Sequence, residues 1–384
     1  MHFCNAQIVL PDSIRKGSLT VRQSRIQKIS GATTAGKQGE RIDLKGGFLA
    51  PGFIDLHIHG AMGRDTMEAT DDAFRTITEF HLQGGTTSIA LTTLTAPEPA
   101  ILKVLEAVRP HHNKSLGGSR IIGVHIEGPF IAKGKAGAQD PAQIRPPAAG
   151  EWKKYLRFGK LIVEMTLAPE ADGALPLIRA LRQNGSIASG GHTDANENHL
   201  LPALEAGLNH ATHTFNAMST ITKTGPYRHA GMIEFTLAKK EIMAELIADG
   251  VHVPAILMRM LFNAKGPDGV CIITDATAGA GLPAGTTFAL ATIRAKVTEN
   301  VAVLEDNTGL AGSTLTMIEG VRRAVQLGGA TVFEAVKMAS LNPARQLERA
   351  KELGSIAAGK RADLVWFDQQ FRVRGVWLDG ERKF

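Results

Sequence analysis

The spacing of apolar and polar residues divides the chain into two kinds of segment. In residues 1–51, and again from residue 346 to the end, short runs alternate between apolar and polar residues, as in Arg25–Ile29. Such alternation is typical of half-exposed antiparallel strands. Each end alone is too small to bury one face of a sheet. We therefore expect residues 1–51 and 346–384 to form one composite β-sandwich domain.

Residues 52–345 show a different pattern, in which apolar runs alternate with helical segments such as Asp71–Gln83 and Glu98–Val108. This pattern favours βα units around a parallel sheet. The eight expected strands are Phe53–His59, Thr86–Thr92, Arg120–Ile126, Leu161–Leu167, Ser186–Gly191, His210–Phe215, Met243–Asp249 and Val270–Thr274. Eight such units predict an α/β fold, a (β/α)8 TIM-type barrel. A doubly wound open sheet is the alternative, but no Gly-rich phosphate fingerprint follows the first strand.

Composition narrows the function classes. The 384 residues include no apolar run of membrane-spanning length and no leader, so we expect a cytoplasmic protein without a membrane partner. Two cysteines, Cys4 and Cys271, cannot make a disulfide framework. The net charge of +6 is spread along a chain with few aromatic residues, which argues against a nucleic-acid partner.

Ionisable residues stand at the ends of several expected strands, where a barrel enzyme carries its chemistry. They are His57, His59, Glu127, His192, His213 and Asp275. His57 and His59 are two apart on one strand and therefore face the same way. Taken singly, each could be a hydrogen-bonded core residue. Taken together, they predict a shared centre that binds a divalent metal such as zinc, iron or cobalt.

These residues lie in motifs that resemble the amidohydrolase superfamily and, within it, the N-acetylglucosamine-6-phosphate deacetylases. The resemblance extends from APGFIDLHIHG near residue 50 to GSIAAGKRADLVWFD near the C-terminus. The narrower motifs are HIEGPF at 125–130, TLAPE at 166–170, HTFNAM at 213–218, ADGVHV at 248–253, ITDAT at 273–277 and LAGSTLTM at 310–317.

The resemblance implies that Glu127, His192 and His213 bind the principal metal ion. His57 and His59 match a pair that helps to hold a second ion in some members, so one or two ions remain open, with zinc as our first expectation. Strand four ends in Leu167 and Ala168 rather than a lysine, which argues against the carboxylated-lysine branch of the superfamily.

The implied reaction is removal of acetyl from N-acetylglucosamine 6-phosphate by a metal-activated water. Asp275 is expected to act as general base and acid, and His252 to polarise the carbonyl group. The family pattern also implies a set of substrate contacts. These are Ala138, Gln139, Asn216, Ala217, Arg228, His252, Leu310, Ala311 and Gly312.

Two departures from the family pattern lie on the substrate side. Gln139 stands where the family commonly has a histidine, and the loop before Arg228 is longer than usual. An amidohydrolase acting on N-acetylgalactosamine 6-phosphate or an unphosphorylated amino sugar is therefore the alternative enzyme, and a non-catalytic barrel relative the alternative class. The resemblance also implies a homodimer or a higher oligomer, in which a neighbouring subunit contributes to the phosphate pocket.

Overall fold

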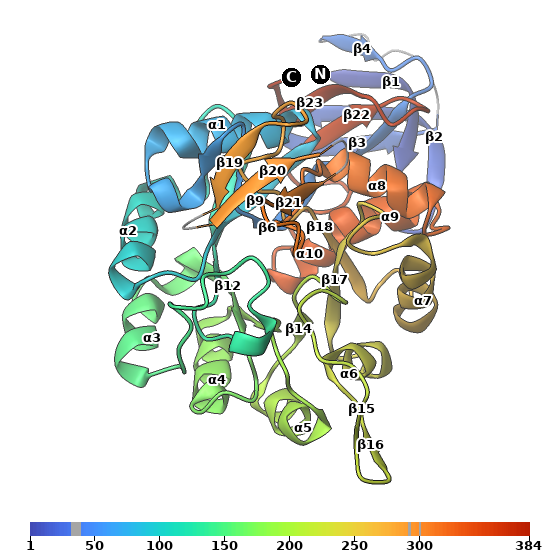
Figure 1. Cartoon of the computed structure of the whole chain (residues 1–384). Helices are drawn as coiled ribbons and strands as arrows, with labels where there is room; N and C mark the ends of the chain where they lie inside the picture. Colours follow the sequence, from blue (N-terminus) through green and yellow to red (C-terminus); the bar gives the residue numbers. More distant parts are fainter. Residues whose placement is uncertain (32–39, 291–292, 299–300) are drawn as a thin grey trace.

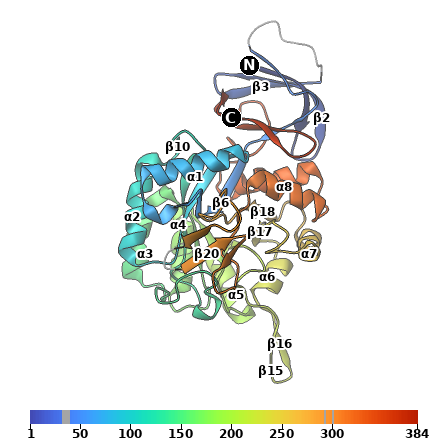
Figure 2. The same ribbon diagram turned by 45° about the horizontal axis from the view of Figure 1, so that its top comes forward.

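The computed structural model describes residues 1–31, 40–290, 293–298 and 301–384, and the chain forms a barrel with a smaller β domain beside it (Figure 1). Both chain ends lie in the β domain, which Figure 2 shows above the barrel. None of the described helices is long and apolar enough to cross a membrane.

The barrel is a sheet of eight parallel strands arranged in chain order. They are β6 (Phe53–Ile58), β9 (Thr86–Thr93), β11 (Arg120–Glu127), β12 (Ile162–Leu167), β13 (Ile187–Gly190), β14 (His210–Ala211), β17 (Met243–Ile247) and β18 (Val270–Ile273). The first and last strands meet where Asp275 N–H donates to His57 O at 2.9 Å, so the barrel is nearly closed. The predicted barrel is confirmed.

One predicted strand is too long. The sixth was expected over His210–Phe215, but β14 stops at Ala211. His213 and Phe215 both have positive φ, 33° and 82°, so the chain leaves the sheet in a series of tight turns.

Helices follow the barrel strands and cover the outside of the sheet (Figure 1). They are α1 (Asp71–Gln83), α2 (Glu98–Val108), α3 (Ala149–Leu156), α4 (Ala174–Asn184), α5 (Glu197–Ala206), α6 (Met232–Ala238), α7 (Ala255–Lys265), α8 (Met317–Gln326), α9 (Val332–Ala339) and α10 (Leu341–Gln346). In α1, Thr70 Oγ1 caps the first turn by accepting from Ala73 N–H, and Phe74 and Ile77 are among the residues buried on one face. Because helices cover the sheet outside and side chains fill it inside, β9 and β11 are buried along their whole length.

The β domain joins the two ends of the chain in one eight-stranded sheet. Its strands are β1 (His2–Val9), β2 (Ile14–Arg22), β3 (Arg25–Ser30), β4 (Arg41–Asp43), β5 (Phe48–Pro51), β22 (Leu364–Phe367), β23 (Val373–Leu378) and β24 (Glu381–Arg382). Phe3 on β1 and Trp377 on β23 are separated in the sheet by two strands, β5 and β22. Their rings nevertheless lie 4.8 Å apart in an edge-on contact. The sheet is therefore folded around a core of its own. Most of the loop predicted between Ile29 and Arg41 lies outside the described residues.

A buried ion pair joins the two parts. Arg120, at the start of β11, donates to Asp363 at 2.8 Å and to Asp379 at 2.6 Å, and its side chain is only 3% exposed. The base of the barrel is thus anchored to the β domain by charge as well as by apolar packing.

Two smaller sheets were not predicted. The first, here called the roof sheet, consists of β19 (Thr287–Leu290), β20 (Ile293–Val297) and β21 (Ala302–Leu304). The second is a hairpin of β15 (Thr222–Thr224) and β16 (Tyr227–His229), which projects from the barrel beyond α6 (Figures 1 and 2). The two remaining short pieces are the β7–β8 hairpin (Gly60–Ala61 and Arg64–Asp65) and β10 (Lys114–Ser115), which pairs with β11.

Candidate metal centre and adjoining pocket

Two groups of three ionisable side chains meet at the carboxyl ends of the barrel strands. One group is Glu127, His192 and His213, and the other is His57, His59 and Asp275. All six residues are buried. The structure therefore brings together the whole set that the sequence predicted as ligands, together with Asp275, and each group could hold a metal ion.

The backbone turns sharply where three of these side chains leave their strands. His192, His213 and Asp275 have φ angles of 48°, 33° and 49°, in the left-handed region that non-glycine residues seldom adopt. Such conformations cost about 1–3 kcal/mol each and cluster at functional sites. Here each one directs a side chain from a strand end toward the common centre.

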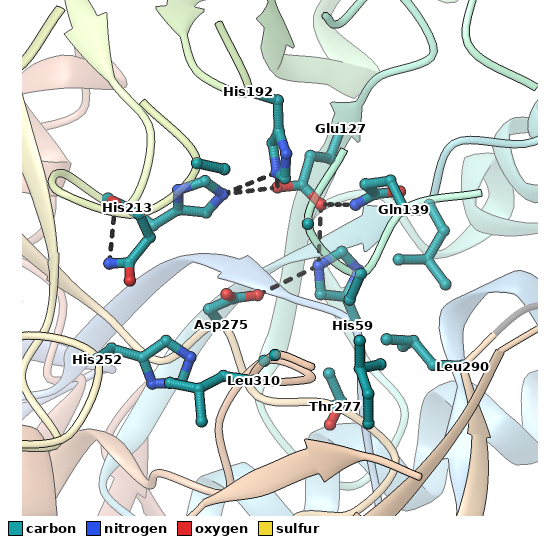
Figure 3. A pocket seen from close by; sticks show the side chains of 18 of the residues that line it. His59, Glu127, Gln139, His192, His213, His252, Asp275, Thr277, Leu290 and Leu310 are labelled. Atoms are coloured by element: carbon teal, nitrogen blue, oxygen red, sulfur yellow. Dashed lines mark hydrogen bonds and ion pairs between the residues drawn. The ribbon is translucent and has the colours of Figure 1, made fainter. Parts of the chain in front are cut away.

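Glu127 lies between the two groups and presents a different oxygen to each. Its Oε1 is 3.2 Å from His192 Nε2 and 3.1 Å from His213 Nε2, whereas its Oε2 is 3.2 Å from His59 Nε2. Figure 3 shows these side chains converging from different strands. A carboxylate in this position can contribute to both groups.

Gln139 holds the outer oxygen of Glu127. Its side-chain carbonyl accepts the Thr95 N–H at 2.7 Å, and its amide N–H2 donates to Glu127 Oε2 through a short contact. A backbone N–H can only donate, so this pairing fixes which end of the Gln139 amide faces the carboxylate. The residue expected to contact substrate thus also holds the carboxylate that is predicted to bind metal.

The donor atoms fit a divalent cation. His192 donates its Nδ1–H to Lys135 O at 2.7 Å, which leaves a lone pair on Nε2 directed at the centre. His192 Nε2 lies 3.0 Å from His213 Nε2, and His57 Nε2 lies 3.2 Å from His59 Nε2. Two clusters of imidazole and carboxylate groups this tight suit zinc, iron or cobalt.

The charged groups of the centre shift one another's pKa. Burial would raise the pKa of Glu127, but the imidazoles of His57, His192 and His213 hold it well below its ordinary value. Burial would lower the pKa of His59, but Asp275 and Glu127 raise it to about 9. Because a metal must displace protons from such imidazoles, acid competes with metal binding.

A pocket of about 310 Å³ opens over the centre. The predicted site residues that line it are His59, Glu127, Ala138, Gln139, His192, His213, Asn216, Ala217, His252, Asp275, Leu310 and Gly312. His57 is fully buried behind the pocket wall. Its Nε2 lies 3.4 Å from both Glu127 Oε1 and Asp275 Oδ1, so it belongs to the centre without facing the pocket.

His252 reaches the pocket from the loop after β17 and is held by Asp249. The carboxylate of Asp249 accepts the ring Nδ1–H at 2.6 Å and the His252 backbone N–H at 2.8 Å. This pairing turns the opposite ring nitrogen, Nε2, toward the space beside Asp275 and Leu310 (Figure 3).

Two predicted substrate residues do not line the pocket. Ala311 is fully buried behind it and accepts a hydrogen bond from Thr277 Oγ1 through its carbonyl. Arg228 lies exposed on the β15–β16 hairpin and is not among the residues that line the pocket. Its role therefore stays a prediction.

The sequence reasoning missed several residues that shape the site. The roof sheet and the loop after it supply Leu290, Leu304, Thr308 and Gly309, and Leu94, Gly137 and Thr277 complete the wall. Asp55 was also missed: it accepts from Thr274 Oγ1 at 2.6 Å and so ties β6 to the segment after β18. A carboxylate inside an apolar strand was the signal that could have identified it.

The fold and the site together define a class, the amidohydrolases. The family model that matches the chain is described as the Amidohydrolase family, and the match covers residues 48–383.

Relatives narrow the assignment. An N-acetylglucosamine-6-phosphate deacetylase of Bacillus subtilis is 38% identical over 321 residues, which cover 83% of this chain and 80% of the relative. An N-acetylgalactosamine-6-phosphate deacetylase of Escherichia coli O157:H7 is 34% identical, covering 87% of each protein. A mutant N-acetyl-D-glucosamine-6-phosphate deacetylase of Mycobacterium smegmatis, solved with N-acetyl-D-glucosamine-6-phosphate, is 31% identical with a TM-score of 0.92 over 100% of this chain and 99% of that one. The chain belongs to the amidohydrolase family and, within it, to the N-acetylglucosamine-6-phosphate deacetylases.

Proposed function

We propose that this protein is a metal-dependent hydrolase that converts N-acetylglucosamine 6-phosphate to glucosamine 6-phosphate and acetate, in amino-sugar catabolism. The observation that carries the proposal is that two groups able to hold a metal ion, one of which includes Asp275, meet beneath one pocket of about 310 Å³. A related structure that holds N-acetyl-D-glucosamine-6-phosphate supports the choice of substrate.

The ligand groups point to zinc as our first choice of metal, with iron or cobalt as alternatives. Glu127, His192 and His213 would hold the principal ion, and His57 and His59 with Asp275 a second one. A bound ion of this kind lowers the pKa of water to about 7 and polarises a carbonyl oxygen.

Asp275 would carry the proton. Its Oδ1 lies 3.3 Å from His59 Nε2, and its side chain also borders the pocket, so one carboxylate faces both the centre and the substrate. It would accept a proton from the attacking water and pass it to the departing amine nitrogen, a role that contributes about 10²–10⁴ in rate. His252 would help to stabilise the negative charge that develops on the acetyl oxygen.

The remaining contacts would hold the sugar. Ala138, Gln139, Asn216 and Ala217 line one part of the pocket, and Leu310 and Gly312 another. Ala311 is buried behind these lining residues and would act only indirectly, through its hydrogen bond with Thr277.

Arg228 would bind the 6-phosphate of a substrate held by a partner subunit. The supporting observation is the hairpin that carries it, which exposes Ile221 and Tyr227 by 59% and 71%. Large apolar side chains exposed together mark contact surfaces. We therefore include a homodimer, or a higher oligomer, in the proposal, and expect Arg228→Ala to raise KM for the phosphorylated substrate with little change in kcat.

Sedimentation of the wild-type protein should show more than one chain per particle. A monomer that is fully active would contradict the proposed oligomer.

A cytoplasmic location completes the proposal. Both cysteines, Cys4 and Cys271, are buried free thiols, as suits a reducing compartment.

The deciding experiment measures acetate release from N-acetylglucosamine 6-phosphate, the unphosphorylated sugar and the galactosamine epimer, with metal content determined on the same sample. We expect rapid turnover of the glucosamine phosphate and a loss of about 10²–10⁴ in kcat for Asp275→Asn. Bound metal without turnover of any of the three compounds would contradict the proposal.

The galactosamine epimer is included for a specific reason. Two relatives named N-acetylgalactosamine-6-phosphate deacetylase, from Escherichia coli O157:H7 and Shewanella, are 34% and 35% identical to this chain. These identities are close to that of the glucosamine enzyme from Bacillus subtilis. A higher kcat/KM for the galactosamine compound would make it the substrate of this protein.

A further inference from the structure

A third group of ionisable side chains lies inside the barrel, apart from the pocket. It consists of Glu164 on β12, His210 on β14 and Glu245 on β17, with their ligand atoms within 4.8 Å of one another. All three side chains are 0% exposed. None of them lines the pocket over the catalytic centre.

The histidine and carboxylate atoms of this group are farther apart than a hydrogen bond allows. His210 Nδ1 lies 3.7 Å from Glu164 Oε1 and 3.7 Å from Glu245 Oε1. By comparison, His252 lies 2.6 Å from Asp249, and His229 lies 2.9 Å from Glu197. His210 thus has two carboxylates beside it and a hydrogen bond to neither.

Five buried polar atoms of this group have no hydrogen-bond partner among the described residues. They are both carboxylate oxygens of Glu164, both ring nitrogens of His210, and Oε1 of Glu245. Burying groups of this kind without a hydrogen bond is costly, because only ion pairs at 3.7 Å replace the water that they lose. The arrangement calls for an additional atom among the three side chains.

We propose that Glu164, His210 and Glu245 form a further metal site, which holds a divalent cation inside the barrel. Two separations of 3.7 Å, with the third at most 4.8 Å, place an equidistant point no more than about 2.4 Å from each ligand atom, near the bond lengths of zinc to histidine and carboxylate. Two carboxylates and a neutral imidazole balance a charge of +2, so the occupied site is neutral overall. The proposal goes beyond the deacetylase function and does not depend on it.

The ion in this site is structural, because its three ligands are sealed from solvent. Glu245 connects the site to the catalytic centre, since its other oxygen, Oε2, lies 3.7 Å from His57 Nδ1 and accepts from His213 N–H at 3.4 Å. The interior ion therefore fixes the Glu245 carboxylate, which contacts His57 and His213 of the catalytic centre.

The first test locates the ion directly. Crystals of the full-length protein, produced in medium supplemented with zinc alone, are measured on both sides of the zinc absorption edge. We expect an anomalous peak bounded by Glu164, His210 and Glu245, separate from any peak beside Glu127. Water density without an anomalous signal at this position would overturn the proposal.

The second test counts metal in a variant. Glu164→Gln keeps the size of the side chain and removes its charge, so we expect one zinc fewer per chain than in wild type, with zinc beside Glu127 retained. The matched control is Glu151→Gln, since the Glu151 carboxylate is held by Arg145 and Tyr155 rather than by a histidine. Unchanged zinc content in Glu164→Gln would also overturn the proposal, and if this variant fails to fold, the wild-type anomalous map decides.

Discussion

At the residue scale, the support of Glu127 by Gln139 is the contact that most distinguishes this site. Gln139 spans from the Thr95 N–H to Glu127 Oε2 and is only 5% exposed. The sequence marked Gln139 as a departure from the family pattern, but could not show this contact, because it depends on how a loop folds back over a strand end. Side chains that hold a metal ligand commonly affect metal affinity or activity by about 10–100-fold.

Gln139→Met should therefore weaken metal retention and lower kcat/KM, each by about 10–100-fold. The substituted side chain fills similar space but can neither donate to Glu127 nor accept from Thr95. Metal retention is measured by competition with a chelator, and kcat/KM by acetate release. Gln143→Met, in the same loop but outside the pocket lining, is the control. Equal metal retention in Gln139→Met and Gln143→Met would show that Glu127 does not need the hydrogen bond from Gln139.

Gly312 limits the backbone beside Asp275. Its φ is +60°, and an added Cβ would lie 2.8 Å from Asp275 O and 2.5 Å from Thr277 Cγ2. Gly312→Ala should therefore cost about 1–2 kcal/mol of stability and displace the proton-carrying carboxylate, lowering kcat at least tenfold by rough expectation. Urea unfolding and steady-state kinetics test both effects. Gly150→Ala is the control, because its Cβ would meet nothing within 4 Å and the residue is not part of the pocket lining.

At the scale of the elements, the sequence predicts the barrel strands well but not the roof sheet or the direction of the β15–β16 hairpin. The barrel strands were predictable because buried apolar runs alternate with helical segments, as β9 and β11 alternate with α1 and α2. The roof sheet was not, because its strands have three to five residues and pair across turns without an apolar run. The position of Arg228 could not be derived either, since the direction of an exposed hairpin depends on tertiary structure.

The junction between barrel and β domain depends on Arg120. Arg120→Ala would leave Asp363, itself 5% exposed, without its closest cationic partner. Breaking a buried pair in this way costs about 3–5 kcal/mol, so the free energy of unfolding in urea should fall by that amount. Arg109→Ala is the control, because the Arg109–Glu106 pair is exposed and should contribute about 0–1 kcal/mol. Similar losses in both variants would mean that burial of the Arg120 pair adds nothing.

At the scale of the whole molecule, buried histidines make stability depend on pH. Burial lowers the pKa of His81 to about 4, although its ring donates to Gly60 O at 3.2 Å. In the unfolded chain the same ring takes up a proton below about pH 6.5. Between pH 6.5 and 4 the unfolded state therefore binds more protons, and stability falls as the pH is lowered.

His81→Gln should remove this part of the acid sensitivity. The stability lost between pH 7 and pH 4 should be smaller than in wild type by up to about 3 kcal/mol. Urea unfolding of both proteins across this range gives the comparison, and any loss of metal in acid is common to both. Parallel stability curves would show that His81 does not titrate in this way.

The roof sheet and the loop after it bring apolar side chains to a pocket whose ionisable residues come from the barrel. The ionisable groups of the centre lie at strand ends of the barrel, whereas Leu290, Leu304 and Leu310 reach the pocket from residues 287–310, which follow Asp275 in the chain. Insertions or exchanges in that segment leave the barrel strands untouched. In such a fold, substrate preference can change between related proteins when this one segment is replaced, while the ionisable groups at the strand ends stay the same.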